Sequence, residues 1–85
     1  MYFVYVLENT LDKSWYIGYT TDIDRRTHEH QHGQGSRTTR IKTGWELIYY
    51  EAYRNQRDAI GREKFLKGGS GRKFLKKQFR NYLGL

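Results

Sequence analysis

The chain has 85 residues, enough for one domain with a modest core, and its composition (36% hydrophobic, 29% charged, no proline) is typical of a folded globular protein. It has no cysteine, which excludes disulfides and cysteine-based zinc sites, and it has no apolar run of signal-peptide or membrane-spanning length, so the cytoplasm is the expected location. The net charge of +7 arises entirely in residues 64–85, where seven basic residues and no acidic ones predict a polyanionic partner such as nucleic acid, or else a merely solvated helix face.

Two runs of strand-forming residues open the chain. Residues Tyr2–Leu7 and Trp15–Tyr19 are aromatic and β-branched, and Glu8–Ser14 between them contains the Asn, Asp and Ser that are typical of a turn. The short connection predicts an antiparallel hairpin. Its pairing would bring Tyr5 and Tyr16 near each other.

A helix is predicted for Thr21–His32, with Thr21 or Asp22 as its cap. The stripe at positions i, i+3, i+4 and i+7 holds one large aliphatic residue and is otherwise polar: Ile23, Arg26, Thr27 and His30. Such a stripe is not ordinary core, and we expect it to line a site. His28, His30 and His32 do not predict a zinc site, because helical residues two apart point about 200° away from each other.

The second half begins with a loop, Gly33–Gly44, that carries Arg37, Arg40 and Lys42. A strand follows at Trp45–Tyr53. Strict alternation would place four of its residues on one side, Trp45, Leu47, Tyr49 and Tyr53, and three on the other, Ile48, Tyr50 and Ala52. Apolar residues on both faces favour a central strand that is covered by helices.

Two helices complete the predicted order. Asn55 is the expected cap of Gln56–Lys67, which Gly68 and Gly69 end, and Ser70 is the expected cap of the last helix. One face of the last helix is mostly apolar, with Phe74, Leu75, Gln78, Phe79 and Tyr82. The opposite face is basic, with Arg72, Lys73, Lys76, Lys77 and Arg80.

Glu63 interrupts an apolar stripe formed by Ala59, Ile60 and Leu66. A buried carboxylate without a partner costs several kcal/mol, so a metal ion or a salt bridge to Arg26 is expected to compensate it. Arg26 suits a phosphate because its planar fork matches phosphate oxygens, and His30 can move a proton or position a nucleophile. A structural glutamate and a solvent-exposed helix face are the alternative interpretations.

These residues resemble the paired signature of the GIY-YIG nuclease superfamily. Phe3-Val4-Tyr5 corresponds to its first half, with phenylalanine and valine in place of glycine and isoleucine, and Tyr16-Ile17-Gly18 is an intact second half. Arg26 follows Gly18 by eight residues, His30 comes one turn later, and Glu63 lies on a later helix. The likeness spans residues 1–85 as one nuclease domain and is to the small stand-alone bacterial members.

The resemblance implies an α/β (α+β) fold, a three-stranded antiparallel sheet flanked by helices in the order β-β-α-β-α-α. It implies an endonuclease that hydrolyses DNA phosphodiester bonds with one divalent ion, Mg²⁺ or Mn²⁺. Glu63 would bind the metal, Tyr5 or Tyr16 would assist deprotonation of the attacking water, Arg26 would stabilise charge on the phosphate and His30 would support one of these steps. Many members carry an asparagine on a helix after the glutamate, and Gln78 and Asn81 are its nearest counterparts here, neither in register.

The substrate would be duplex or branched DNA, with DNA repair or recombination as the expected setting and a protein partner as a source of specificity. The backbone contacts would come from the three cations of the loop and from the five on the basic face of the last helix. The first alternative is a nucleic-acid-binding module with the same fold and little catalysis. The second is a small basic ribosomal or RNA-binding protein, which would explain the charge but not the tyrosine pair or Glu63.

Overall fold

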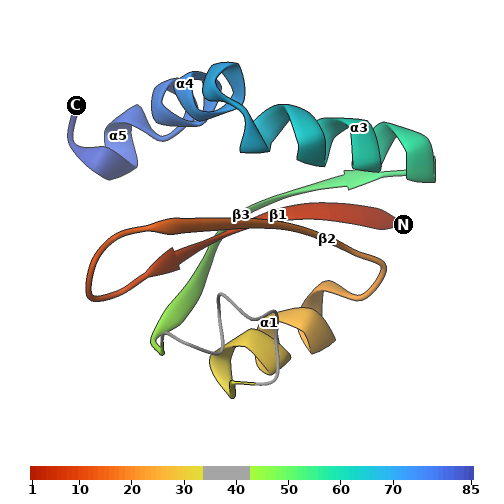
Figure 1. Ribbon diagram of the computed structural model, residues 1–85, viewed down its shortest axis with the longest axis horizontal. Helices are drawn as coiled ribbons and strands as arrows, with labels where there is room; N and C mark the ends of the chain where they lie inside the picture. Colours follow the sequence, from red (N-terminus) through yellow and green to blue (C-terminus); the bar gives the residue numbers. More distant parts are fainter. Residues whose placement is uncertain (34–42) are drawn as a thin grey trace.

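The computed structural model describes residues 1–33 and 43–85 and contains a three-stranded sheet with helices on both faces (Figure 1). The elements in chain order are β1 (Tyr2–Asn9), β2 (Trp15–Thr20), α1 (Ile23–Gln31), β3 (Trp45–Tyr53), α3 (Gln56–Lys67), α4 (Gly69–Gln78) and α5 (Arg80–Leu83). The predicted α+β architecture and its element order are therefore confirmed, with one additional short helix. No helix in the described residues is long and apolar enough to cross a membrane.

The first strand, β1, lies at the centre of the sheet. The strand order is β2-β1-β3, and β1 pairs antiparallel with both neighbours. The prediction that residues 45–53 form the central strand is therefore wrong, because β3 lies at an edge. The residues of β1 explain its position, since the run from Val4 to Asn9 is buried on both faces of the sheet.

The two faces of β1 enter different cores. Val4 and Val6 pack with Leu66, Leu75 and Phe79 on the face that α3 and α4 cover. Tyr5 and Leu7 pack with Trp45, and residues of β2 and α1 border them, on the other face. Figure 1 shows α1 on one side of the sheet and α3, α4 and α5 on the other. The alternation of β1 thus places its successive side chains in two separate cores, one on each face of the sheet.

A β-bulge in β3 changes the faces that its residues occupy. Val6 is opposite Tyr49 and Leu7 is opposite Leu47, so Ile48 is an extra residue in β3. Trp45 and Leu47 therefore join the core on the α1 side, whereas Tyr49 and Tyr53 pack on the side of α3. The predicted single stripe of these four residues is wrong because strict alternation does not continue through a bulge.

The helix starts follow side-chain capping where a polar cap is present. Asp22 accepts a hydrogen bond from the Arg25 backbone and caps α1, and Asn55 accepts from Arg57 and caps α3 as predicted. Ser70 is not a cap, because α4 already begins after Gly68. The last predicted helix is also interrupted at Phe79, which separates α4 from α5.

Candidate active site

Tyr5, Tyr16 and His30 form a compact cluster on the α1 side of the sheet. The Tyr5 hydroxyl lies 2.9 Å from Nε2 of His30 in a buried hydrogen bond. The His30 ring centroid is 5.8 Å from that of Tyr5 and 5.0 Å from that of Tyr16, and the two tyrosine rings are 6.3 Å apart. Tyr5 and His30 are each only 2% exposed, whereas Tyr16 is half-buried. The structure therefore brings together the hairpin tyrosines and the histidine of the polar stripe.

Gly18 makes room for the Tyr5 ring. Tyr5 is directly opposite Gly18 in the β1–β2 ladder, so its side chain crosses the position where a β-carbon would stand. A β-carbon placed on Gly18 would lie 2.3 Å from the Tyr5 oxygen and 2.4 Å from its Cζ. The glycine of the Tyr16-Ile17-Gly18 motif is thus required by the position of the other tyrosine and not by backbone conformation, since its φ is not positive.

Burial determines the protonation states of the Tyr5–His30 pair. Burial, and then the neighbouring Tyr16, raise the pKa of Tyr5 above its ordinary value of 10.0. Burial, and then Arg26, lower the pKa of His30 below its ordinary value of 6.5. At neutral pH the pair is therefore a protonated phenol hydrogen-bonded to a neutral imidazole. This arrangement contains a base, His30, and a hydroxyl group that can pass a proton to it.

Arg26 lies beside this pair with unused hydrogen-bonding capacity. Among the described residues, its buried Nε has no hydrogen-bond partner, and its ionic partner is Glu29 at 3.7 Å. The Arg26 side chain is 37% exposed. Its positive charge partly offsets the rise in the pKa of Tyr5 that burial causes, and it adds to the lowering of the pKa of His30 by burial. Within residues 1–33 and 43–85, two other buried polar atoms lack partners, namely Thr27 Oγ1 on α1 and Trp45 Nε1 in the core on the α1 side. Unpaired buried donors are costly, and they indicate a place where a polar ligand would complete the hydrogen bonding.

Glu63 is nearer to the surface than predicted and has a different partner. Its side chain is 20% exposed and forms a salt bridge of 3.1 Å with Lys67, one helical turn away. Of the two expected compensating partners, a metal ion or Arg26, the salt bridge to Arg26 is replaced by this one. Although α3 packs on the other face of the sheet, the Glu63 carboxylate is close enough to raise the pKa of Tyr5. Glu63 is thus an electrostatic neighbour of Tyr5 across the sheet.

The predicted DNA-contacting cations are not at this cluster. Arg72, Lys73, Lys76, Lys77 and Arg80 lie on α4 and at the start of α5, on the opposite side of the sheet from α1 (Figure 1). Gln78 and Asn81, the nearest counterparts of the family asparagine, are exposed on the same two helices. Arg37, Arg40 and Lys42 lie outside the described residues.

Sequence reasoning missed two features of the site. Trp45 packs edge-on against Tyr16 with ring centroids 6.3 Å apart, and only a tryptophan at the start of a strand signalled it. His28 and His32 stack with ring centroids 4.0 Å apart, but both are exposed. Within residues 1–33 and 43–85, no three His, Asp or Glu side chains gather closely enough to hold a metal ion by themselves.

A three-stranded antiparallel sheet with a tyrosine pair on one face, covered there by a helix that carries a histidine and an arginine, defines the class of protein. The family described as the GIY-YIG catalytic domain matches residues 1–78. The chain therefore belongs to the GIY-YIG family, which is a family of nucleases.

Several UPF0213 proteins are similar to the chain. One from Haloquadratum walsbyi is 39% identical over 66 residues, which are 78% of this chain and 73% of that protein. YazA of Bacillus subtilis is 36% identical over 66 residues, covering 78% of this chain and 66% of its own. A solution NMR structure of a UPF0213 protein from Bacillus halodurans has a TM-score of 0.55 and 38% identity, over 96% of this chain and 85% of that one. These names state no activity, so the chemistry has to be argued from the site.

Proposed function

We propose that the chain is a divalent-metal-dependent endonuclease that hydrolyses DNA phosphodiester bonds, and that Tyr5, Tyr16, Arg26, His30 and Glu63 form its catalytic site. The observation that carries this proposal is the buried hydrogen bond between Tyr5 and His30, with Arg26 beside it. A neutral histidine that is hydrogen-bonded to a tyrosine hydroxyl can accept its proton. An arginine beside it can donate hydrogen bonds to phosphate oxygens.

In this mechanism the half-buried Tyr16 forms a hydrogen bond to the attacking water and positions it. The water gives its proton to the Tyr5 oxygen as the Tyr5 proton moves to Nε2 of His30, so that His30 is the final acceptor. Arg26, whose side chain is 37% exposed, donates to the phosphate from its guanidinium and stabilises the charge that develops on it. Tyr5 alone could not act as the base near pH 7, because its pKa is raised, and the imidazole therefore supplies the basicity.

The donor set fits magnesium better than zinc. Structural zinc requires four nitrogen or sulfur ligands, whereas Mg²⁺ keeps several waters and takes one or two carboxylates together with substrate phosphate oxygens. Glu63 would hold the ion, because its ionic partner among the described residues is the 54%-exposed Lys67, and exposed i,i+4 pairs are weak. A bound Mg²⁺ or Mn²⁺ ion would polarise the phosphate and stabilise the leaving oxygen.

Cleavage of supercoiled plasmid and of a branched duplex, each with Mg²⁺ and with chelator, tests the proposal. We expect cutting that requires Mg²⁺, is lost in Glu63→Gln and falls about 100-fold in Arg26→Gln, the range typical of removing one donor from a developing charge. Glu46→Gln and Arg25→Gln are matched controls, since each makes the same charge change at an exposed residue. Equal cutting by Glu63→Gln and wild type would refute the metal-binding role of Glu63.

The second candidate function is a nucleic-acid-binding module that cuts poorly or not at all. One observation favours it, namely that Gln78 and Asn81 lie on α4 and α5 and supply no asparagine to the tyrosine cluster. Under this alternative, wild type binds both DNA substrates but leaves them intact with Mg²⁺ or Mn²⁺. The same experiment therefore separates the two functions.

A further inference from the structure

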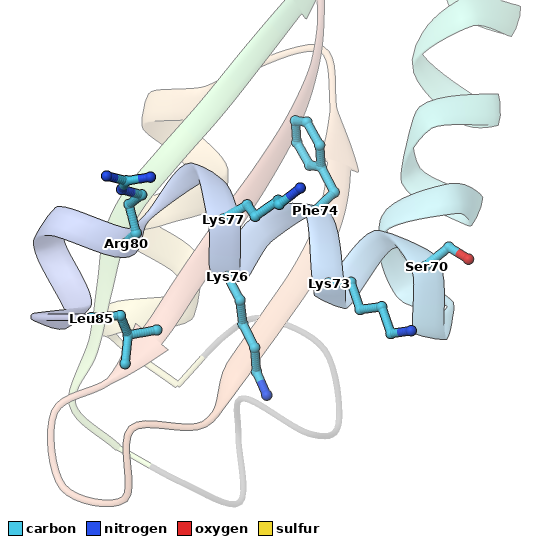
Figure 2. A pocket seen from close by; sticks show the side chains of 7 residues that line it. All are labelled: Ser70, Lys73, Phe74, Lys76, Lys77, Arg80 and Leu85. Carbon is cyan, nitrogen blue, oxygen red and sulfur yellow. The ribbon is translucent and has the colours of Figure 1, made fainter.

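Three adjacent hollows along α4, α5 and the hairpin turn share lining residues, and together they are called the groove. The first, of about 890 Å³, is lined by Ser70, Lys73, Phe74, Lys76, Lys77, Arg80 and Leu85. Figure 2 shows that these side chains come from α4, from α5 and from Leu85, which follows α5. The second, of about 390 Å³, shares Lys76 and Leu85 with the first and adds Lys13, Trp15 and Arg72. The third, of about 360 Å³, shares Lys13 and Trp15 with the second and ends at Glu8 and Tyr82.

The groove has basic edges and apolar walls. Its cations are spread along its length, whereas Phe74, Trp15 and Leu83 supply apolar surface between them. Trp15 is held in one orientation, because its Nε1 donates to Glu8, its ring packs edge-on against Phe79 and the Arg72 guanidinium lies 5.5 Å from its centre. Alternating cations and apolar surface are what a single strand needs, because each nucleotide presents one phosphate and one flat base.

Lys13 has a backbone conformation that points to a role beyond the turn. Its φ is +63°, a left-handed conformation that glycine and asparagine adopt readily but that is strained for lysine. The turn fixes it there, since the Lys13 amide donates to the Asn9 carbonyl and Ser14 is bonded to Asp12. The turn thus keeps a strained residue whose side chain lines two of the hollows.

One carboxylate also borders the groove. Glu8 is buried, and its two oxygens accept hydrogen bonds from Trp15 and Tyr82. A phosphate would therefore not approach this end, and the run of cations stops at Lys13.

We propose that this groove binds a single-stranded segment of DNA. The phosphates would lie on Lys13, Arg72 and three lysines of α4, Lys73, Lys76 and Lys77. The bases would pack against Trp15, Leu83 and Phe74. A duplex fits less well, because its bases are paired and stacked and cannot enter apolar hollows. The groove faces away from the tyrosine cluster, so binding here does not require hydrolysis. A substrate with a single-stranded arm can engage the protein on both sides of the sheet, whereas a uniform duplex engages only one.

Fluorescence anisotropy in EDTA, where cleavage does not occur, tests this binding independently of the proposed hydrolysis. The ligands are labelled (dT)20, a duplex hairpin with the same number of phosphates, (rU)20 and a polyglutamate of equal charge. We expect (dT)20 to bind most tightly. Tighter binding of the hairpin, of (rU)20 or of polyglutamate would overturn the proposal and would assign the groove to duplex, to RNA or to an acidic protein segment.

Two variants and one control locate the binding. Lys76→Gln is expected to weaken (dT)20 binding about fivefold at 0.1 M salt and to lower the salt slope by about 0.7, the effect of losing one single-strand phosphate contact. Lys13→Gly should weaken binding similarly while leaving Tm unchanged or higher, because glycine relieves the left-handed strain. The control, Arg57→Gln, removes one charge from exposed α3, outside the groove. Equal weakening by Arg57→Gln, or unchanged binding by Lys13→Gly, would overturn the assignment.

Discussion

Substituting Gly18 with alanine should displace Tyr5 and thereby disrupt the candidate active site. The added β-carbon would stand 2.3 Å from the Tyr5 oxygen and 2.4 Å from Cζ, whereas ordinary contact begins near 3.4 Å. The ring must therefore move by about 1 Å in a close-packed interior. Because Tyr5 is 2% exposed and bonded to His30 at 2.9 Å, the ring has no free space, and the movement breaks or lengthens that hydrogen bond.

The expected loss of stability follows from three terms. Overpacking a core costs about 1–3 kcal/mol and the lost hydrogen bond about 1 kcal/mol, and alanine returns about 0.4–1 kcal/mol by restricting the unfolded chain. We therefore expect Gly18→Ala to lower the free energy of unfolding by about 2–3 kcal/mol. If the protein cleaves DNA, activity under conditions where the variant remains folded should fall about 100-fold, as for other displacements of this size.

Urea unfolding at pH 7, followed by tyrosine and tryptophan fluorescence, measures the first effect and plasmid cleavage the second. Gly61→Ala is the matched control, because a β-carbon at this α3 position meets nothing within 4 Å and alanine should stabilise the helix by about 1 kcal/mol. Equal stability and activity of Gly18→Ala and wild type would show that Tyr5 tolerates displacement, and the role assigned to Gly18 would then be refuted.

Three further predictions concern other parts of the structure. The folded-state pKa of His30 lies below its unfolded value, so its contribution to stability is present above pH 6.5 and is lost as pH falls below that value. In urea titrations between pH 5 and 7, His30→Gln should therefore lose less stability on acidification than wild type. An unchanged pH dependence would contradict the argument from burial. Gly71→Ala should lower the free energy of unfolding by about 3 kcal/mol or more, because its β-carbon would lie 2.0 Å from the Phe65 carbonyl oxygen and 2.4 Å from Leu66 Cα. Gly69→Ala is the control, because a β-carbon there has no atom within 4 Å, and it should lower stability far less in the same assay. Glu51→Gln should lower the free energy of unfolding by about 2–3 kcal/mol by leaving the Arg62 guanidinium poorly paired, whereas Glu46→Gln on the exposed side of the same strand should change it by less than about 0.5 kcal/mol.

Local signals predicted the elements of this fold well. Asn55 and Gly68 set the ends of α3 at the predicted residues, and the polar turn set the hairpin that brings Tyr5 and Tyr16 together. The polar stripe of α1 was also informative, because burying His30 required a partner and the structure supplies Tyr5. In each case the determining residues are close in sequence or belong to one periodic pattern.

Long-range pairing was not predictable in the same way. The position of β3 at the edge and the bulge at Ile48 depend on its register with β1, about forty residues away in the chain, and no residue within β3 encodes that register. The helical pattern also did not show that Glu63 pairs with Lys67, one turn away on the same helix, and not with a residue distant in sequence. The tight packing at Gly71 was not predicted, because a sequence does not show that the backbone of another helix passes within contact distance.

The position of Glu63 depends on its neighbour Arg62. Arg62 donates two hydrogen bonds to Glu51 of β3, at 2.9 and 3.0 Å, and its guanidinium lies 4.4 Å from the centre of the Phe74 ring of α4. Tyr49 and Tyr53 donate to the same carboxylate, so hydrogen bonds hold the pKa of Glu51 below its ordinary value even though burial alone would raise it. Because successive helical residues point about 100° apart, fixing Arg62 fixes the rotation of α3 and with it the direction of Glu63. A helix that packs on the side of the sheet away from α1 is thereby oriented so that its Glu63 carboxylate contributes to the raised pKa of Tyr5, whose side chain lies on the α1 side.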